Sequence, residues 1–356
     1  MGPDPVRRDL PGEVTESSHA NSAAPIGWGV IGASTIAREY MVDAIRRSGG
    51  EPLWLMSRND THRADFAHEL GIPHHSAELA GMLADERVKA VYVSSINSLH
   101  RQQVIKAALA GKHVLCDKPL ATRAADALKM VKACEKAGVV LAVNHHLRSS
   151  PVHQTIRRMI AAGDIGEVRS LIIIHAGLLR PVLQTWRIKD PDEGAIYLDL
   201  SVHDIDLASF LLQQQPETAI GIGAALALGD ASAHDHTMYA LRMSGGAFVQ
   251  VNESFVTPDV ESQVMAYGSE GILIATGTLA QKSTGTLVRR LRGRNEAIPL
   301  RANDIYADTV GQFLAAIEGR GTPHASGRDG LASLVGAEAV ARAVKTRKSV
   351  AIKVPE

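Results

Sequence analysis

Residues 26–37 have the sequence Ile-Gly-Trp-Gly-Val-Ile-Gly-Ala-Ser-Thr-Ile-Ala, and this stretch decides the fold. It predicts a short buried strand, a tight turn at Gly32 and a helix that begins near Thr35. Dinucleotide-binding Rossmann folds place G-x-G-x-x-G or G-x-G-x-x-A at such a turn. Aligned from Gly32, the chain has Ser34 at the middle glycine and Ala37 at the last small residue.

Each position of this turn suits a phosphate group. Gly32 allows the tight turn, and Ala37 allows the helix to pack close to the strand. Ser34 is small, and its hydroxyl can bind a phosphate, while the free N–H groups at the helix start attract an anion. A strand, turn and helix without a ligand is the alternative. The residues expected to hold the cofactor here are Gly32, Ala33, Ser34, Thr35, Ile36 and Ala37.

Composition limits the class of protein. The 356 residues suffice for two domains, and 38 basic residues balance 38 acidic ones, so nothing indicates a nucleic acid or a charged membrane as partner. No apolar run is long enough to span a bilayer. The two cysteines, Cys116 and Cys134, lack metal-type spacing, so we expect free thiols and a cytoplasmic location. Residues 1–25 are expected to form a disordered tail.

The order of apolar segments predicts two different domains. Over residues 26–146, continuous apolar strands alternate with helices, which is typical of a parallel sheet covered on both faces. Over residues 147–326, strand-like segments dominate, and we expect an open, mostly antiparallel sheet. Residues 327–356 are expected to form a last helix and tail that return to the first domain. The predicted class is thus α/β, a Rossmann domain followed by an α+β domain.

The end of the second strand favours NADP(H) over NAD(H). Ser57 and Arg58 stand close to where NAD enzymes carry an acid for the ribose, and His62 and Arg63 follow about one helical turn later. A hydroxyl and a guanidinium suit a 2′-phosphate. The arginines are solvated surface charges in the alternative interpretation, and Asp60 keeps NAD open.

Two further strand ends carry polar residues that are expected at the same edge of the sheet. Ser95, Asn97 and His100 follow the third long strand, where Asn97 or Ser98 can also cap a helix. Asp117 and Lys118 follow the next strand. Because Lys118 precedes a proline, its backbone is extended or turned, which directs the ammonium toward a crevice where it can polarise a carbonyl.

Asp199 and His203 are four residues apart on a predicted helix and therefore share one face. A carboxylate beside an imidazole suits a general acid or base, although such pairs are also common on surfaces. The paired histidines at 74–75, 145–146 and 234/236 do not predict a metal site, because no thiolate or HExxH-like set accompanies them.

Together, the glycine turn, Asp117-Lys118-Pro119 and the Asp199/His203 pair resemble the Gfo/Idh/MocA oxidoreductase family from about residue 26 to 318. Residues 28–38, 144–148 and 186–187 are similar to those of members that reduce 1,5-anhydro-D-fructose. Two features depart from the family pattern: Asp117 replaces a glutamate, and residues 192–195, Asp-Glu-Gly-Ala, replace three glycines.

The resemblance implies a role for each matching residue. Lys118 would contact nicotinamide and substrate, with a cis bond to Pro119. His203 would donate the proton, and Asp199 and His146 would contact the substrate. The resemblance also implies that the cofactor and substrate cleft is lined by Asn144, Trp186, Arg187 and Tyr306.

The resemblance further implies an NADPH-dependent reductase of a cyclic ketosugar, converting 1,5-anhydro-D-fructose to 1,5-anhydro-D-mannitol, with a small-molecule sugar as partner and a homo-oligomer formed through the open sheet. An NAD(P)-dependent dehydrogenase of another sugar, an anhydrosugar or an inositol is the alternative. A non-catalytic NADP-binding regulator is a second alternative, against which the set of Lys118, Asp199 and His203 argues.

Overall fold

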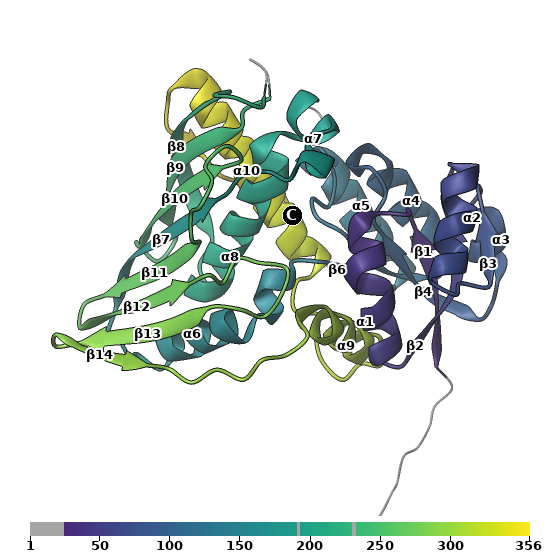
Figure 1. Cartoon of the computed structure of the whole chain (residues 1–356), viewed down its shortest axis with the longest axis horizontal. Helices are drawn as coiled ribbons and strands as arrows, with labels where there is room; N and C mark the ends of the chain where they lie inside the picture. Colours follow the sequence, from purple (N-terminus) through teal and green to yellow (C-terminus); the bar gives the residue numbers. More distant parts are fainter. Residues whose placement is uncertain (1–24, 191–192, 230–232) are drawn as a thin grey trace, which may run out of the picture.

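A computed structural model describes residues 25–190, 193–229 and 233–356. It contains two sheets that lie side by side, with helices between and around them (Figure 1). The expected tail, apart from Pro25, and Asp192 lie outside the described residues. The predicted combination of a parallel-sheet domain and a mostly antiparallel-sheet domain is confirmed.

The first sheet is wholly parallel, in the order β3-β2-β1-β4-β5-β6. This is the strand order of a dinucleotide-binding fold, in which ligands bind where the order reverses, between β1 and β4. The apolar strands are buried on both faces, as in β4, where Ala90 to Val93 are completely buried. The strands are β1 (Ile26–Ile31), β2 (Gly50–Met56), β3 (His74–Ser76), β4 (Val88–Val93), β5 (His113–Cys116) and β6 (Leu141–Val143).

Helices cover both faces of this sheet. Val42 and Ile45 pack against one face together with Phe313, which comes from much later in the chain, and Val104 packs against the other. Helical backbone begins at Thr35, as predicted, and passes through a π-helical turn, η1 (Ala37–Met41). The helices are α1 (Val42–Arg47), α2 (Asp60–Glu69), α3 (Ala80–Ala84), α4 (Asn97–Leu109), α5 (Ala124–Ala137) and, from later in the chain, α9 (Ile305–Ile317).

The second sheet has the strand order β14-β13-β12-β11-β7-β10-β9-β8-β15. Only β7 and β10 pair in parallel; the other neighbours are antiparallel. The strands are β7 (Val168–Ala176), β8 (Pro216–Ala224), β9 (His236–Met243), β10 (Phe248–Ser254), β11 (Gln263–Gly268), β12 (Gly271–Thr276), β13 (Thr286–Leu291), β14 (Arg294–Ala297) and β15 (Val350–Ala351).

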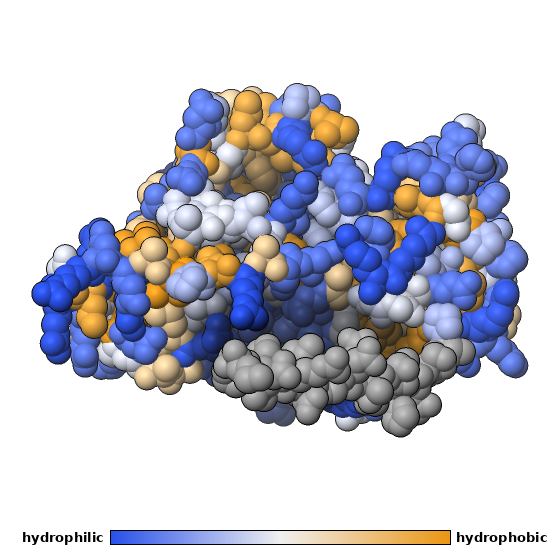
Figure 2. Space-filling model, turned by 60° about the horizontal axis from the view of Figure 1, so that its bottom comes forward, coloured by the Kyte–Doolittle hydropathy of each residue, from blue (hydrophilic) through white to orange (hydrophobic). Residues whose placement is uncertain are grey.

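One face of the second sheet is covered and the other is open. On β9, which lies between β8 and β10, Tyr239 and Leu241 point to the covered face and are buried. Met238 points to the opposite face and is exposed, as the alternation of side chains along a strand predicts. The covering elements are α6 (Pro151–Ala161), η4 (Tyr197–Ser201), α8 (Val202–Leu212) and α10 (Gly327–Thr346). Seen from below, hydrophobic side chains are interspersed among polar ones on the side of this sheet (Figure 2).

The last two helices connect the halves. α9 follows the second sheet in sequence but packs against α1 and η1 of the first half. α10 contacts α5 and β6 on one side and α8 and β8 on the other. The last helix therefore reaches the first domain while also covering the second sheet, and after it β15 pairs with β8 at the edge of the second sheet. None of the helices described is both long and apolar enough to cross a membrane.

Candidate active site

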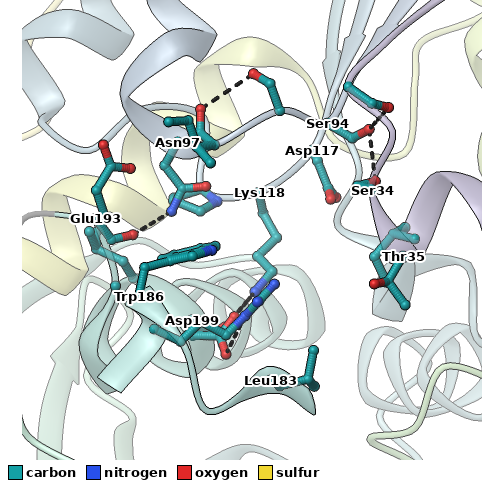
Figure 3. A pocket seen from close by; sticks show the side chains of 18 of the residues that line it. Ser34, Thr35, Ser94, Asn97, Asp117, Lys118, Leu183, Trp186, Glu193 and Asp199 are labelled. Carbon is teal, nitrogen blue, oxygen red and sulfur yellow. Dashed lines mark hydrogen bonds and ion pairs between the residues drawn. The ribbon is translucent and has the colours of Figure 1, made fainter. Parts of the chain in front are cut away.

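A cavity of about 630 Å³ lies between the two halves, within the usual range for ligand sites. Its first wall is formed by the carboxyl ends of β1, β2, β4 and β5, and its second by η4, α8, β7 and the short helix α7 (Trp186–Lys189). Figure 3 shows side chains from both walls directed toward the same space. The edge of the parallel sheet at which the polar residues were expected is therefore one wall of this cavity.

The glycine turn forms one end of the cavity. Gly32 has a φ of +106° and its N–H donates to the Met56 carbonyl at 2.8 Å. A Cβ at Gly32 would lie 2.6 Å from the Ser95 nitrogen, so only glycine fits. Ser34 Oγ donates to Ser94 Oγ at 2.9 Å and accepts the Ala37 N–H at 3.1 Å. The turn thus presents a narrow backbone cradle and a serine hydroxyl, which suit a phosphate.

Ser57 and Arg58 lie beside this turn and both line the cavity. Arg63 donates to the Ser57 carbonyl at 2.7 Å and pairs with Asp60 at 2.7 Å. Asp60 is therefore engaged by a neighbouring cation, whereas Arg58 is exposed at the cavity rim. The local charge available to a bound group at this point is positive.

The middle of the cavity is lined by the residues that follow β4. The side-chain amide of Asn97 donates to the Glu193 carbonyl at 2.6 Å, and the Glu193 carboxylate accepts the Ser98 N–H at 3.0 Å, which caps α4 (Figure 3). The capping residue of α4 is thus Glu193 from the opposite wall rather than Asn97. His100 is buried, with its ring nitrogens 3.0 Å from the Pro119 carbonyl and 3.1 Å from the Ser95 carbonyl.

Lys118 and Asp199 meet across the cavity. Lys118 Nζ donates to Asp199 Oδ1 at 2.6 Å and to the Asp199 carbonyl at 2.8 Å. Arg187 Nε lies 3.8 Å from Asp199 Oδ2. Burial would raise the pKa of Asp199, but the charges of Lys118 and Arg187 outweigh it and lower that pKa below its usual value. The peptide bond between Lys118 and Pro119 is cis, as the resemblance implied.

Asp117 lies beside the lysine and faces inward from the end of β5. Burial raises the pKa of Asp117, against the opposing effect of Lys118 and a hydrogen bond from the Asn144 amide at 3.1 Å. The other side-chain atom of Asn144, Oδ1, is buried without a donor in the described part of the chain. Asn144 thus holds Asp117 from behind the cavity wall.

His203 lies against the rings of His145 and His146 and near the charge of Lys118. The ring of His146 meets the ring of His203 edge-on, with 5.2 Å between the centroids, and His145 meets it in the same way at 5.8 Å. His146 in turn stacks on Tyr306 at 5.3 Å. Burial, followed by the charge of Lys118 and the neighbouring His146 and His145, lowers the pKa of His203 well below 6.5. His203 is therefore a neutral imidazole at neutral pH in this structure, with Nδ1 lacking a partner among the described residues.

The structure separates the expected site residues into two groups. Most line the cavity, including Asp117, Trp186 and Arg187; the Arg187 guanidinium lies 4.5 Å from the centre of the Trp186 ring. Four expected cofactor residues do not line it: Ala37, His62, Asn144 and Tyr306. Ala37 is completely buried at the turn, His62 bonds to the Ala33 carbonyl at 3.2 Å, and Asn144 and Tyr306 lie behind residues that form the wall.

Sequence reasoning missed several lining residues. His175 on β7 lines the second wall, as do Arg180, Leu183 and Gln281. They come from segments without a recognisable motif, and only the pairing of β7 at the sheet centre places His175 near Asp199. Within the described segments, no group of three or more histidine, cysteine or acidic side chains could hold a metal ion.

Comparison with known proteins agrees with this architecture. Residues 26–145 match the model of an oxidoreductase family with an NAD-binding Rossmann fold, and residues 153–274 match the GFO/IDH/MocA C-terminal domain. The chain belongs to the Gfo/Idh/MocA family of oxidoreductases. The family membership expected from the turn, the lysine and the Asp199/His203 pair is thus confirmed.

Relatives of the chain include proteins named for sugar and polyol substrates. The chain is 40% identical to 1,5-anhydro-D-fructose reductase of Ensifer adhaerens, over 92% of this chain and 98% of that protein. It is 25% identical to myo-inositol 2-dehydrogenase of Thermotoga maritima, over 81% and 87%. A solved levoglucosan dehydrogenase in complex with NADH shares the fold, with a TM-score of 0.83, 18% identity, and 93% and 100% coverage.

Proposed function

We propose that the protein is an NADPH-dependent reductase of a cyclic ketosugar and that 1,5-anhydro-D-fructose is its substrate, reduced to 1,5-anhydro-D-mannitol. The observation that carries the reaction class is the Lys118–Asp199 ion pair beside His203, in a cavity that continues to the Gly32 turn. The 40% identity to a 1,5-anhydro-D-fructose reductase over almost the whole chain supports the substrate.

The residues present fit a dinucleotide at the first wall. A Cβ would fill the cradle at Gly32, the Ser34 hydroxyl lies beside it, and Arg58 at the rim suits a 2′-phosphate. We propose that Gly32 to Ile36 hold the pyrophosphate, that Ser57 and Arg58 hold the adenosine end, and that Ser95, Asn97, His100 and Asp117 flank the nicotinamide end. Trp186 and Arg187 would cover it from the second wall.

The chemistry divides between cofactor and protein. A nicotinamide bound here supplies the hydride. Lys118 provides a fixed positive charge for the oxygen on which negative charge develops, and its bonds to Asp199 hold the ammonium in place. Asp199 Oδ2 lies 3.8 Å from Arg187 Nε and is available to a sugar hydroxyl. The buried walls exclude water, so these charges act in a medium of low polarity.

The proton comes from His203 or from Lys118 in this proposal, and we assign it to His203. The ring of His203 lies on the helix face of Asp199, and with His146 it lines the substrate end of the cavity. Because burial and nearby cations disfavour its imidazolium form, His203 is a strong acid once protonated, and transfer to an alkoxide is correspondingly favourable.

We further propose that two copies associate through the open face of the second sheet. Exposed side chains of β8, β9 and β10 border an apolar depression there: Ile220, Ile222, Met238 and Phe248. A contiguous apolar patch on a protein surface usually marks an interface, and identical copies commonly pair through the same patch. Light scattering of the wild type and of Phe248→Asp tests this, since a monomeric wild type contradicts it.

The proposed function is tested by following NADPH oxidation with a panel of ring ketones. We expect the highest kcat/KM with 1,5-anhydro-D-fructose and NADPH. Oxidation of myo-inositol or levoglucosan with NAD⁺, without reduction of any ketosugar, would instead identify a dehydrogenase. Tight NADPH binding without turnover of any panel member would favour the regulatory alternative.

A further inference from the structure

A buried chain of polar groups runs from the cavity wall into the second sheet. His175 lines the cavity, and its Nδ1 lies 2.9 Å from Asp204 Oδ1. Asp204, on α8, and Glu253, on β10, are both completely buried. Glu253 Oε1 accepts the Tyr239 hydroxyl at 2.8 Å, and Oε2 accepts the Ser201 hydroxyl at 2.6 Å. None of these groups takes part in the reaction proposed above.

A proton on one of the two carboxyls would satisfy the last open acceptor of this chain. The two carboxyl groups have four oxygens, and Tyr239, Ser201 and His175 supply donors to three of them. The fourth, Asp204 Oδ2, is buried with no donor among the described residues. A buried acceptor without a donor costs about 1–3 kcal/mol in general, so a missing proton is the simplest explanation.

Glu253 is the carboxyl placed to hold this proton. Ser201, whose hydroxyl donates to Glu253, precedes Asp204 by three residues on the same helical stretch, which places Asp204 on the side that faces Glu253. Burial, followed by the charge of Asp204, raises the pKa of Glu253 well above its ordinary value. Two adjacent carboxyls in a buried site cannot both ionise at low cost. A protonated Glu253 donates to Asp204 Oδ2, which completes the four bonds and leaves one negative charge on the pair.

We propose that Asp204 and Glu253 share a single proton and act as positioning residues that hold the Nδ1–H of His175 toward Asp204, leaving Nε2 for a substrate oxygen. A carboxylate bonded to one ring nitrogen fixes which nitrogen of a histidine is free. Nε2 has no hydrogen-bond partner in the described part of the chain, and the side chain is 17% exposed. The charge of His175 acts on the pKa values of four titratable neighbours, Asp199, His146, His153 and His203.

Infrared difference spectroscopy tests the shared proton without any substrate. We expect the carbonyl band of a protonated carboxylic acid in the wild type at neutral pH and its loss in Glu253→Gln, which keeps the shape and a donor for Asp204. Asp85→Asn is the matched control, because Arg87 and Trp54 lower the pKa of Asp85 and keep it ionised. Identical spectra of the wild type and Glu253→Gln in this region would overturn the shared proton.

Kinetics test the positioning role, and this part rests on the proposed function. We expect Asp204→Ala to raise the KM for the ketosugar at least about tenfold, with a smaller effect on kcat and none on NADPH affinity. Asp204→Asn keeps an acceptor for His175, so its KM should be close to that of the wild type. In a chain that already carries His175→Asn, Asp204→Ala should cause no further increase in the KM for the ketosugar. A fully additive effect overturns the link to His175. A wild type that reduces no ketosugar refutes the proposed function instead, and the infrared result still decides the shared proton.

Discussion

Lys118 Nζ lies 2.6 Å from Asp199 Oδ1, so an ammonium from the end of β5 and a carboxylate from η4 form one ion pair between the two halves of the molecule. Both side chains are more than four-fifths buried, at 16% and 19% exposure. A pair this buried is stable only with additional hydrogen bonds, which the Asp199 carbonyl provides at 2.8 Å. The geometry leaves the ammonium fixed rather than mobile, as stabilisation of a developing charge requires.

We expect Lys118→Ala to reduce kcat by about 10²–10³, the usual effect of removing a donor from a developing oxyanion. It should also weaken NADPH binding, because the neighbouring Asp117 loses its counter-charge. Steady-state rates and fluorescence titration with NADPH measure both effects. Lys129→Ala, which removes an exposed lysine that pairs with Asp126, is the control and should leave both unchanged. An unchanged kcat in Lys118→Ala would remove the lysine from the mechanism.

Cofactor preference is predicted to depend on Arg58. One charge-assisted contact with a phosphate is worth about 1.5–3 kcal/mol, or roughly ten- to a hundredfold in KM. Arg58→Ala should therefore raise the KM for NADPH by this factor and leave that for NADH almost unchanged. Arg63→Ala is the matched variant: Arg63 holds the Ser57 carbonyl, so its loss should affect both cofactors equally. Equal wild-type KM values for the two cofactors would contradict the assignment.

Ser34 is predicted to tolerate only small replacements. Its hydroxyl accepts the Ala37 N–H and contacts Ser94, so Ser34→Gly loses one cap but keeps the space for a phosphate. We expect Ser34→Gly to bind NADPH within about threefold of the wild type, since replacing a cap by glycine costs only a few tenths of a kcal/mol. Ser34→Leu should not bind detectably. Normal affinity in Ser34→Leu would place the phosphates elsewhere.

Local signals in the sequence were sufficient for the fold and for part of the site. The glycine turn could be recognised because Gly32 has a φ of +106° and no space for a Cβ, so the backbone itself requires glycine there. This turn in turn predicts the parallel sheet. Lys118 could be found because the proline after it sets its backbone. Asp199 and His203 could be found because their spacing is that of one helix face.

The remaining site residues depend on contacts between distant segments. His175 enters the cavity because β7 lies at the centre of the second sheet, beside β10, which a list of apolar segments does not reveal. Glu253 appears as an ordinary acid in a strand, and only its burial against Asp204 gives it a role. Tyr306 was expected at the cofactor, but it stacks on His146 at 5.3 Å between ring centroids and does not line the cavity.

The proton donor is predicted to show itself in the pH dependence of reduction. Burial and the cations around His203 lower its pKa well below 6.5, so the fraction of imidazolium, the form that can donate, falls as pH rises through that lowered value. If His203 is the acid, kcat for reduction should increase as pH decreases below 6.5. Steady-state rates across this range at saturating NADPH measure the profile.

Substitution of His203 separates it from Lys118 as the donor. We expect His203→Ala to lower kcat by about 10²–10⁴ and to abolish the rise at low pH, while NADPH affinity persists because the Gly32 turn lies in the other half. His68→Ala, which changes an exposed histidine on α2, should alter neither. If His203→Ala keeps nearly the wild-type kcat and a flat profile, the Lys118 ammonium is the donor, and His203 serves only to pack His146 and His145 against the helix that carries Asp199.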